Sequence, residues 1–242
     1  MHFLYGLIRW FGLDTIACVI SIQLFLGRFR NGVDGWLLVG LCCAVSMVYI
    51  VDRYRDLMVG RGVSARHMVY QNRLVWVLVS VVFLGVGAFL YWLVLDGGSQ
   101  LVLVACAGVG GAHMWLLRFG WYQWVKDWVV ASMFAVVMMV GYFDLVAMGV
   151  LIGVFTVFNL TVHRLVENGA SRCDWFLVFG LVAGVMGLVW GNVGFSWLFV
   201  VWLGAVIGQL GLVVVGRRIW YWYELGELMF LVPFIVGYFD FF

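Results

Sequence analysis

The sequence contains little charge and almost no proline. Only 11% of its 242 residues are Asp, Glu, Lys or Arg, and proline occurs once, whereas soluble domains average about 25% charged residues. Hydrophobic residues make up 66% of the chain, and the mean hydropathy is +1.09. This composition excludes an ordinary soluble domain and predicts an integral membrane protein.

Paired cysteines and nucleic-acid motifs are also missing. The five cysteines have no paired spacing, and four of them lie inside apolar segments: Cys18, Cys42, Cys43 and Cys106. This distribution argues against a disulfide framework and against a zinc site, so we interpret the cysteines as packing residues. No nucleic-acid-binding motif is present, and we expect no nucleic-acid partner.

Long apolar runs occupy almost the whole chain. A membrane-spanning helix needs roughly 20 mostly apolar residues, and nine windows meet this requirement. They cover residues 5–27, 36–52, 73–95, 100–118, 125–143, 145–163, 174–191, 195–215 and 220–239. We therefore expect an all-α polytopic membrane protein of nine transmembrane helices, in a single domain that covers residues 1–242. The first window is too long for the core of a signal peptide and is interpreted as a retained helix.

The basic residues lie mainly on alternate connections between these windows. If the connections after the second, fourth, sixth and eighth windows face the cytoplasm, 12 of the 14 Lys and Arg residues lie on that side, and Arg28 and Arg30 lie outside. The positive-inside rule then predicts a cytoplasmic N-terminus and an external C-terminus, in a plasma or inner membrane. The longer connections are cytoplasmic too, so we expect the functional site at that face.

The stretch "YIVDRYRDLM", residues 49–58, places charge at the cytoplasmic end of the second window. Asp52 and Asp56 are four residues apart, so on a helix both carboxylates point the same way. Two such carboxylates make a partial site for Mg²⁺, which takes oxygen ligands and keeps waters and substrate phosphates. Arg53 lies beside them and is a candidate for binding substrate. The alternative is a charged helix end at the membrane interface, in which Arg and Asp neutralise each other.

Two further stretches carry polar residues at the same spacing. In "FNLTVHRLVENGA", residues 158–170, the side chains of Asn159, His163 and Glu167 recur every four residues and can coordinate a metal. In "RFGWYQWVKDWVV", residues 118–130, Tyr122 and Lys126 are four apart, and lysine binds phosphate as a point charge. A polar helix end and an aromatic belt with a snorkelling lysine are the alternative readings.

Other polar residues are candidates for substrate binding. Asp14 lies about half-way along the first window, where an ionisable group is expected to face the interior of the bundle. His113, near the inner end of the fourth window, can join it, although a lone histidine is more often a satisfied interior residue. Arg61 and Arg66 follow the second window and can meet phosphate oxygens.

In their order and spacing, these stretches resemble the UbiA superfamily of intramembrane prenyltransferases. That family has nine helices, a cytoplasmic N-terminus, an N-D-x-x-D-x-x-x-D motif after helix two, Y-x-x-x-K after helix four and a D-x-x-x-D-x-x-x-D-like motif after helix six. Asp52 and Asp56 match the last two acids of the first motif, and Tyr122 and Lys126 match the middle one. The second Asp-rich motif keeps its spacing with altered residues.

The resemblance implies a fold, a cofactor and roles for these residues. It implies a nine-helix UbiA-like bundle in which Mg²⁺, held by Asp52, Asp56, Asn159, His163 and Glu167, binds the diphosphate of a polyprenyl substrate. Asp52, Asp56 and Glu167 would be catalytic. The residues assigned to substrate binding are Arg53, Arg61, Arg66, Tyr122, Lys126, Asp14 and His113. The sequence departs from the family at Val48 and Tyr49, where the first motif should open with Asn and Asp, and it offers three acids where the family usually has more.

Three functions are consistent with these observations. The first is Mg²⁺-dependent transfer of an isoprenoid from a polyprenyl diphosphate to a lipophilic acceptor. The second is a UbiA-like protein without catalysis, which binds lipid or isoprenoid or serves as a subunit of a larger membrane complex, and the eroded acids favour it. The third is a small transporter, which Asp14 favours; the single proline and the lack of a Gly/Pro-interrupted pair of matching helices argue against it.

Overall fold

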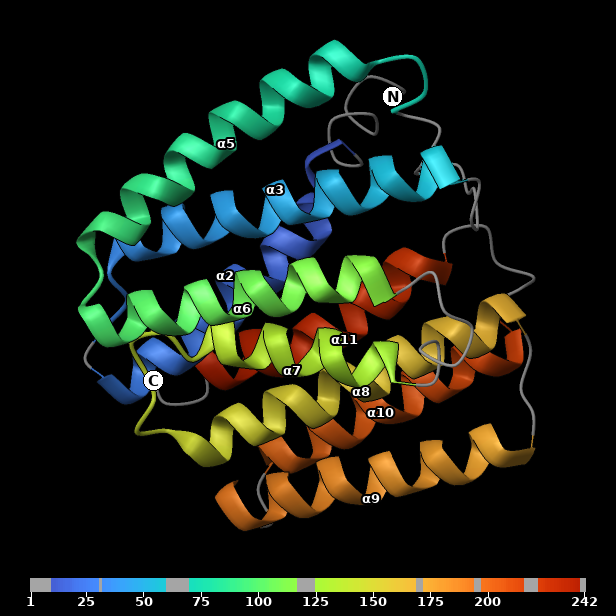
Figure 1. The fold of residues 1–242 in the computed structure, drawn as a ribbon. Coiled ribbons are helices and arrows are strands. Elements are labelled where there is room, and N and C mark those ends of the chain that lie inside the picture. Colours follow the sequence, from blue (N-terminus) through green and yellow to red (C-terminus); the bar gives the residue numbers. More distant parts are fainter. Residues whose placement is uncertain are drawn as a thin grey trace. The chain divides into compact units, whose positions relative to one another are not determined.

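The computed structural model describes residues 10–30, 32–59, 70–116, 125–168, 172–193, 197–215 and 222–239. Within these residues the secondary structure is entirely helical, with nine α-helices and one short 3₁₀-helix (Figure 1). The α-helices are α2 (Leu13–Gly27), α3 (Gly35–Val59), α5 (Leu74–Val94), α6 (Gly97–Leu116), α7 (Lys126–Met138), α8 (Val146–Asn168), α9 (Arg172–Val193), α10 (Trp197–Val215) and α11 (Trp222–Phe239). The expectation of an all-α fold is confirmed.

Three helical segments in the described residues are long and apolar enough to cross a membrane: Gly35–Met58, Leu74–Val94 and Val146–Val166. Shorter apolar helices run over Leu177–Gly191, Phe199–Val214 and Leu228–Phe239. Only 17% of the most apolar window of Leu74–Val94 is buried inside the protein, against 61% for Val146–Val166. Leu74–Val94 therefore exposes an apolar surface suited to lipid, whereas Val146–Val166 is a core helix. That all nine helices span the membrane, with the N-terminus in the cytoplasm, stays a prediction.

The chain forms two compact units, Met1–Leu95 and Asp96–Phe242. In the first unit, α3 packs along α5, and α2 packs on α3. A Cβ atom at Gly40 would collide with Tyr91, so this glycine lets α3 and α5 approach closely. The unit has a core of Trp10, Ile50, Tyr70, Val77 and Leu84.

Two hydrogen bonds join Trp10 to residues in and just before the first turns of α5. The Tyr70 hydroxyl donates to the carbonyl oxygen of Trp10 at 2.6 Å, and the Trp10 indole donates to Ser80 Oγ at 3.0 Å. The rings of Trp10 and Tyr70 lie 4.7 Å apart. Burial raises the pKa of Tyr70 above its ordinary value, because the phenolate would lose its hydration; Tyr49 and Asp14 act in the same direction, and Arg53 opposes them. The residue is thus a neutral hydrogen-bond donor.

In the second unit α8 is the central helix, because it packs against α7, α9, α10 and α11. Its middle carries Phe155, which is fully buried and lies 4.9 Å from Trp202 of α10 and 4.8 Å from Phe230 of α11, measured between ring centroids. Phe234 completes the group, 5.3 Å from Trp202. These four side chains form an aromatic layer between α8, α10 and α11.

Asp96 begins the second unit and caps α6. Its carboxylate accepts hydrogen bonds from the backbone N–H of Ser99 at 3.0 Å and from the Ser99 hydroxyl at 2.6 Å. These hydrogen bonds lower the pKa of Asp96, because they stabilise the charged form. Helix α3 is capped in the same way by Asp34, which accepts from the N–H of Trp36 at 2.8 Å.

Candidate functional site

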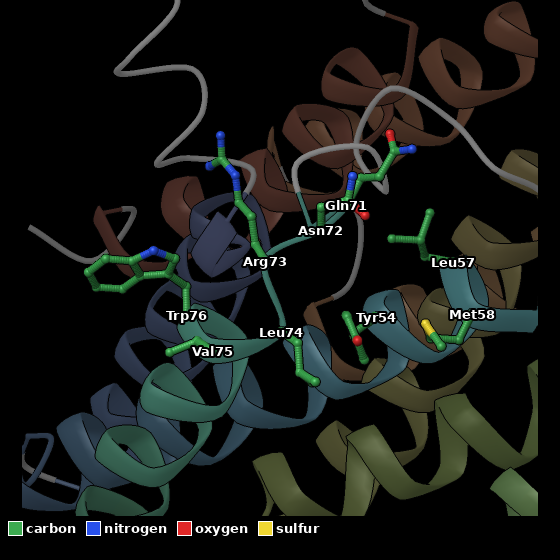
Figure 2. Close-up of a pocket in the computed structure, with 9 residues that line it drawn as sticks. All are labelled: Tyr54, Leu57, Met58, Gln71, Asn72, Arg73, Leu74, Val75 and Trp76. Carbon is green, nitrogen blue, oxygen red and sulfur yellow. The ribbon is translucent and has the colours of Figure 1, made fainter.

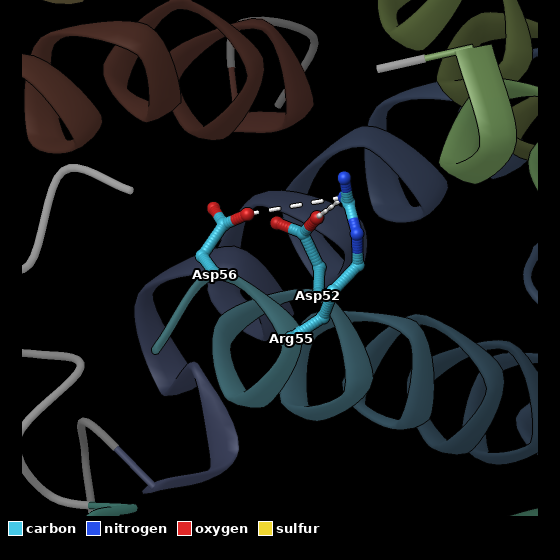
Figure 3. A network of polar contacts seen from close by, with 3 residues as sticks. All are labelled: Asp52, Arg55 and Asp56. Carbon is cyan, nitrogen blue, oxygen red and sulfur yellow. Dashed lines mark ion pairs between the residues drawn. The ribbon is translucent and has the colours of Figure 1, made fainter. Parts of the chain in front are cut away.

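Asp52 and Asp56 lie in the last two turns of α3 and point to the same side of the helix (Figure 3). Each carboxylate has an oxygen 3.8 Å from the same guanidinium nitrogen of Arg55. At 3.8 Å these contacts are ion pairs without a well-formed hydrogen bond. The spacing of four residues therefore does bring two carboxylates together, and one loosely held arginine neutralises them.

The pair of carboxylates can serve as half of a magnesium site. The Asp52 and Asp56 side chains are 36% and 23% exposed, so water and a phosphate group can reach them. Mg²⁺ is commonly held by one or two carboxylates and completed by waters and phosphate oxygens. The donor set fits one such ion. No group of three or more His, Cys, Asp or Glu residues in the described part of the chain is arranged to hold a metal.

Arg53 lies against an aromatic ring of the same helix. Its guanidinium carbon lies 5.1 Å from the centre of the Tyr49 ring, a distance at which a cation is attracted to the ring face. The charge of Arg53 also acts on the buried Tyr70. Tyr49 therefore has a structural role at the position where the family motif has an Asp, and Arg53 is positioned beside the core of the first unit.

Asp14 does not lie half-way along an unbroken helix. Gly12 adopts a left-handed backbone with φ of 61°, so α2 begins at Leu13 and Asp14 falls in its first turn. The Asp14 carboxylate accepts a hydrogen bond from the N–H of Thr15 at 2.9 Å and is partly exposed. A carboxylate in this place is stabilised by the helix dipole. Asp14 is therefore a charged residue at the start of a helix, and the expectation that it lies in the middle of one is wrong.

A pocket of about 760 Å³ lies where α3 ends and α5 begins (Figure 2). Tyr54, Leu57 and Met58 of α3 form one side, and residues 71–76 form the other. The second side includes Asn72, whose φ of 57° is left-handed. The pocket gives the end of α3 a hollow with polar and apolar walls.

The second unit brings together the start of α7 and the end of α8. Arg164 of α8 forms an ion pair with the Asp127 carboxylate at a distance of 2.9 Å, and the two side chains are 28% and 12% exposed. Lys126 is the first residue of α7 and directly precedes Asp127. The predicted phosphate-binding lysine and the predicted second polar motif thus lie at adjoining helix ends.

Asn159 and His163 are buried one turn apart on α8, with 5% and 7% of their surfaces exposed. A Cβ atom at Gly226 of α11 would lie 2.8 Å from Nε2 of His163, so the glycine leaves the space that the imidazole occupies. His113 is also buried, in the last turn of α6. The polar face predicted for residues 159–163 therefore points into the protein.

Several predicted residues lie outside the described part of the structure. These are Arg61, Arg66 and Tyr122, together with the side chain of Glu167, whose backbone continues α8. Their assignment to catalysis, substrate binding or metal binding stays a prediction.

Sequence reasoning missed three polar residues that the structure makes prominent. Arg164 and Asp127 were not paired, because no local spacing links residues of two different helices. Gln209 of α10 was overlooked, although it is fully buried. Its signal was a lone amide inside an apolar window, the same signal that singled out Asn159.

A comparison with family models gives no match, and comparisons with curated proteins and with solved structures give none either. The resemblance to the UbiA superfamily therefore rests on the motif residues and stays a prediction. What the structure adds is the arrangement of those residues within each unit.

Proposed function

We propose that this protein is a UbiA-like membrane prenyltransferase, which binds a polyprenyl diphosphate through Mg²⁺ and transfers its isoprenoid to a lipophilic acceptor. The observation that carries the proposal is the pair Asp52 and Asp56, whose carboxylates share one side of α3 next to exposed apolar helix surface. A site for a molecule with a charged head and an apolar tail needs these two surfaces side by side.

The carboxylates of Asp52 and Asp56 would hold the ion. When bound, Mg²⁺ would neutralise charge that develops on the departing diphosphate. Arg55, which lies within 3.8 Å of both carboxylates, would donate hydrogen bonds to phosphate oxygens of a substrate bound there.

In the second unit, Lys126 would bind phosphate as a point charge and His163 would be a metal ligand. Support comes from the ion pair of Asp127 with Arg164, which fixes the helix end that carries Lys126 against the helix that carries His163.

A non-catalytic subunit that binds isoprenoid is the second candidate function. The observation that favours it is the absence, among the described residues, of a third acid beside Asp52 and Asp56. Such a protein would bind a prenyl diphosphate but would not cleave the bond between the isoprenoid and the diphosphate.

One experiment separates these functions. Purified protein in lipid nanodiscs is mixed with Mg²⁺ and geranyl, farnesyl or geranylgeranyl diphosphate, and both bound ligand and released diphosphate are measured, with added membrane lipid extract as a source of acceptor. Binding with release supports the prenyltransferase, and binding without release supports the subunit. Absence of binding to all three diphosphates contradicts both.

A further inference from the structure

In the described part of the second unit, two buried amide side chains have atoms without a hydrogen-bond partner. Gln209 of α10 has no exposed surface, and Asn159 of α8 is 5% exposed. Within the described residues, the side-chain oxygen and nitrogen of Gln209 make no hydrogen bond, and the side-chain oxygen of Asn159 makes none either. Leaving such groups unpaired inside a protein is unfavourable, so a bound group that pairs with them would be stabilised there.

The aromatic layer places both amides in one core. Phe155 of α8 and Trp202 of α10 have ring centroids 4.9 Å apart. Asn159 follows Phe155 by four residues and Gln209 follows Trp202 by seven, so each amide lies above the layer on the same helix face as the aromatic residue. Both side chains therefore belong to the packing of α8 against α10.

The third wall of this core is α11. A Cβ atom at Gly226 would meet both the His163 imidazole, at 2.8 Å, and Leu212 Cδ1, at 3.5 Å. His163 is one turn beyond Asn159, and Leu212 is one turn beyond Gln209, so the two amides lie at similar depth between the aromatic layer and this glycine.

Movable side chains occupy the space beside the amides. The Met229 sulfur lies only 2.7 Å from where a Cβ atom of Gly208 would be, and the His163 ring fills the space at Gly226. A methionine side chain is flexible and adapts to irregular gaps. A small ligand group can therefore enter by moving side chains, without moving helix backbone.

The unpaired atoms define the chemistry of the missing partner. Asn159 Oδ1 and Gln209 Oε1 need a donor, and Gln209 Nε2 needs an acceptor. A hydroxyl group can donate to one of these oxygens and accept from Gln209 Nε2, whereas a carboxylate or phosphate supplies acceptors alone and brings a charge into an apolar core. We propose that Asn159 and Gln209 bind the un-ionised hydroxyl group of an apolar molecule, between α8, α10 and α11.

If the protein transfers prenyl groups, that molecule is the acceptor. This assignment rests on the proposed function, but binding of the hydroxyl does not. The test therefore uses probes without a diphosphate and contains no Mg²⁺, so that its outcome is independent of prenyl diphosphate binding.

The experiment measures thermal unfolding of the purified protein with 4-butylphenol, 4-butylbenzoate and butylbenzene, which share one apolar body. The phenol should stabilise the wild type more than the other two, and Gln209→Leu should weaken phenol binding about tenfold or more, because a buried amide loses its partner. Gln23→Leu, which alters a buried glutamine of the first unit, should keep the response.

Equal responses to phenol and butylbenzene would overturn the proposal, as would an unchanged phenol response in Gln209→Leu. A wild type that does not respond, together with a stabilised Gln209→Leu, would identify the partner as buried water and would also overturn it. Gln209→Met keeps the length of the side chain and should lose the phenol response in the same way. Even where a variant fails to fold, the comparison of the three probes on the wild type tests whether the protein prefers a hydroxyl group.

Discussion

The ion pair between Asp127 and Arg164 should hold α7 against α8. At 2.9 Å the guanidinium nitrogen and the carboxylate oxygen form a close ion pair, and the Asp127 side chain is only 12% exposed. Replacing Asp127 by Asn keeps the shape of the side chain but removes its charge. Arg164 is then left without its carboxylate, 28% exposed and partly shielded from water.

The magnitude follows from the degree of burial. Exposed ion pairs contribute about 0.2–1 kcal/mol, whereas removal of one partner from a fully buried pair costs about 3–5 kcal/mol. Because Arg164 keeps some contact with water, we expect Asp127→Asn to lower the free energy of unfolding by about 2 kcal/mol. The matched control is Arg55→Gln, which removes two ion pairs that are longer, at 3.8 Å, and whose carboxylates are more exposed than that of Asp127. Its effect should stay below about 0.5 kcal/mol.

The assay is equilibrium unfolding in mixed micelles, followed by tryptophan fluorescence as denaturing detergent is added. A double-mutant cycle with Asp127→Asn and Arg164→Gln isolates the interaction of the two side chains from their other contacts. A coupling free energy near zero would refute the reasoning, since the two residues would then stabilise the helices independently.

Two further substitutions probe each unit separately. Tyr70→Phe removes the hydroxyl that donates to Trp10 at 2.6 Å and should destabilise the protein by about 1–3 kcal/mol, because the carbonyl stays buried without its donor; an unchanged unfolding midpoint would contradict this. Gly226→Ala places a Cβ atom 2.8 Å from the His163 ring, so it should displace the imidazole and shift its NMR signals, although alanine favours helix by about 1 kcal/mol. Unmoved signals would show that the backbone yields instead.

Helix positions could be predicted well because apolar length is a local property of the sequence. Each of the nine predicted windows contains a helix in the described residues. The predicted and observed helix ends differ where a helix continues beyond the apolar residues. The second window ends at residue 52, but α3 continues to Val59, since the charged residues at its end are compatible with a helix.

Apolarity does not reveal a change of backbone conformation. The first window runs over residues 5–27, yet the left-handed conformation of Gly12 breaks it and places Asp14 at a helix start. Glycine adopts this conformation without steric cost, so a single glycine in an apolar run gave little warning.

The candidate site was predictable only where its geometry is local. A spacing of four residues brings Asp52 and Asp56 to one side of a helix, and the structure shows that arrangement (Figure 3). The partners of buried polar residues come from other helices, as Arg164 does for Asp127. Such pairs depend on packing, which residue spacing in one chain segment does not encode.

We propose that the two carboxylates of α3 hold a magnesium ion for a prenyl diphosphate. The decisive measurement is the affinity for farnesyl diphosphate as Mg²⁺ is added, in the wild type and in the double variant Asp52→Asn/Asp56→Asn. Asp34→Asn is the matched control, because it changes an aspartate at the opposite end of α3 and asparagine still caps a helix. The account predicts Mg²⁺-dependent binding in the wild type and in Asp34→Asn, and its loss in the double variant. Binding that is independent of Mg²⁺, or equal in all three proteins, would contradict it.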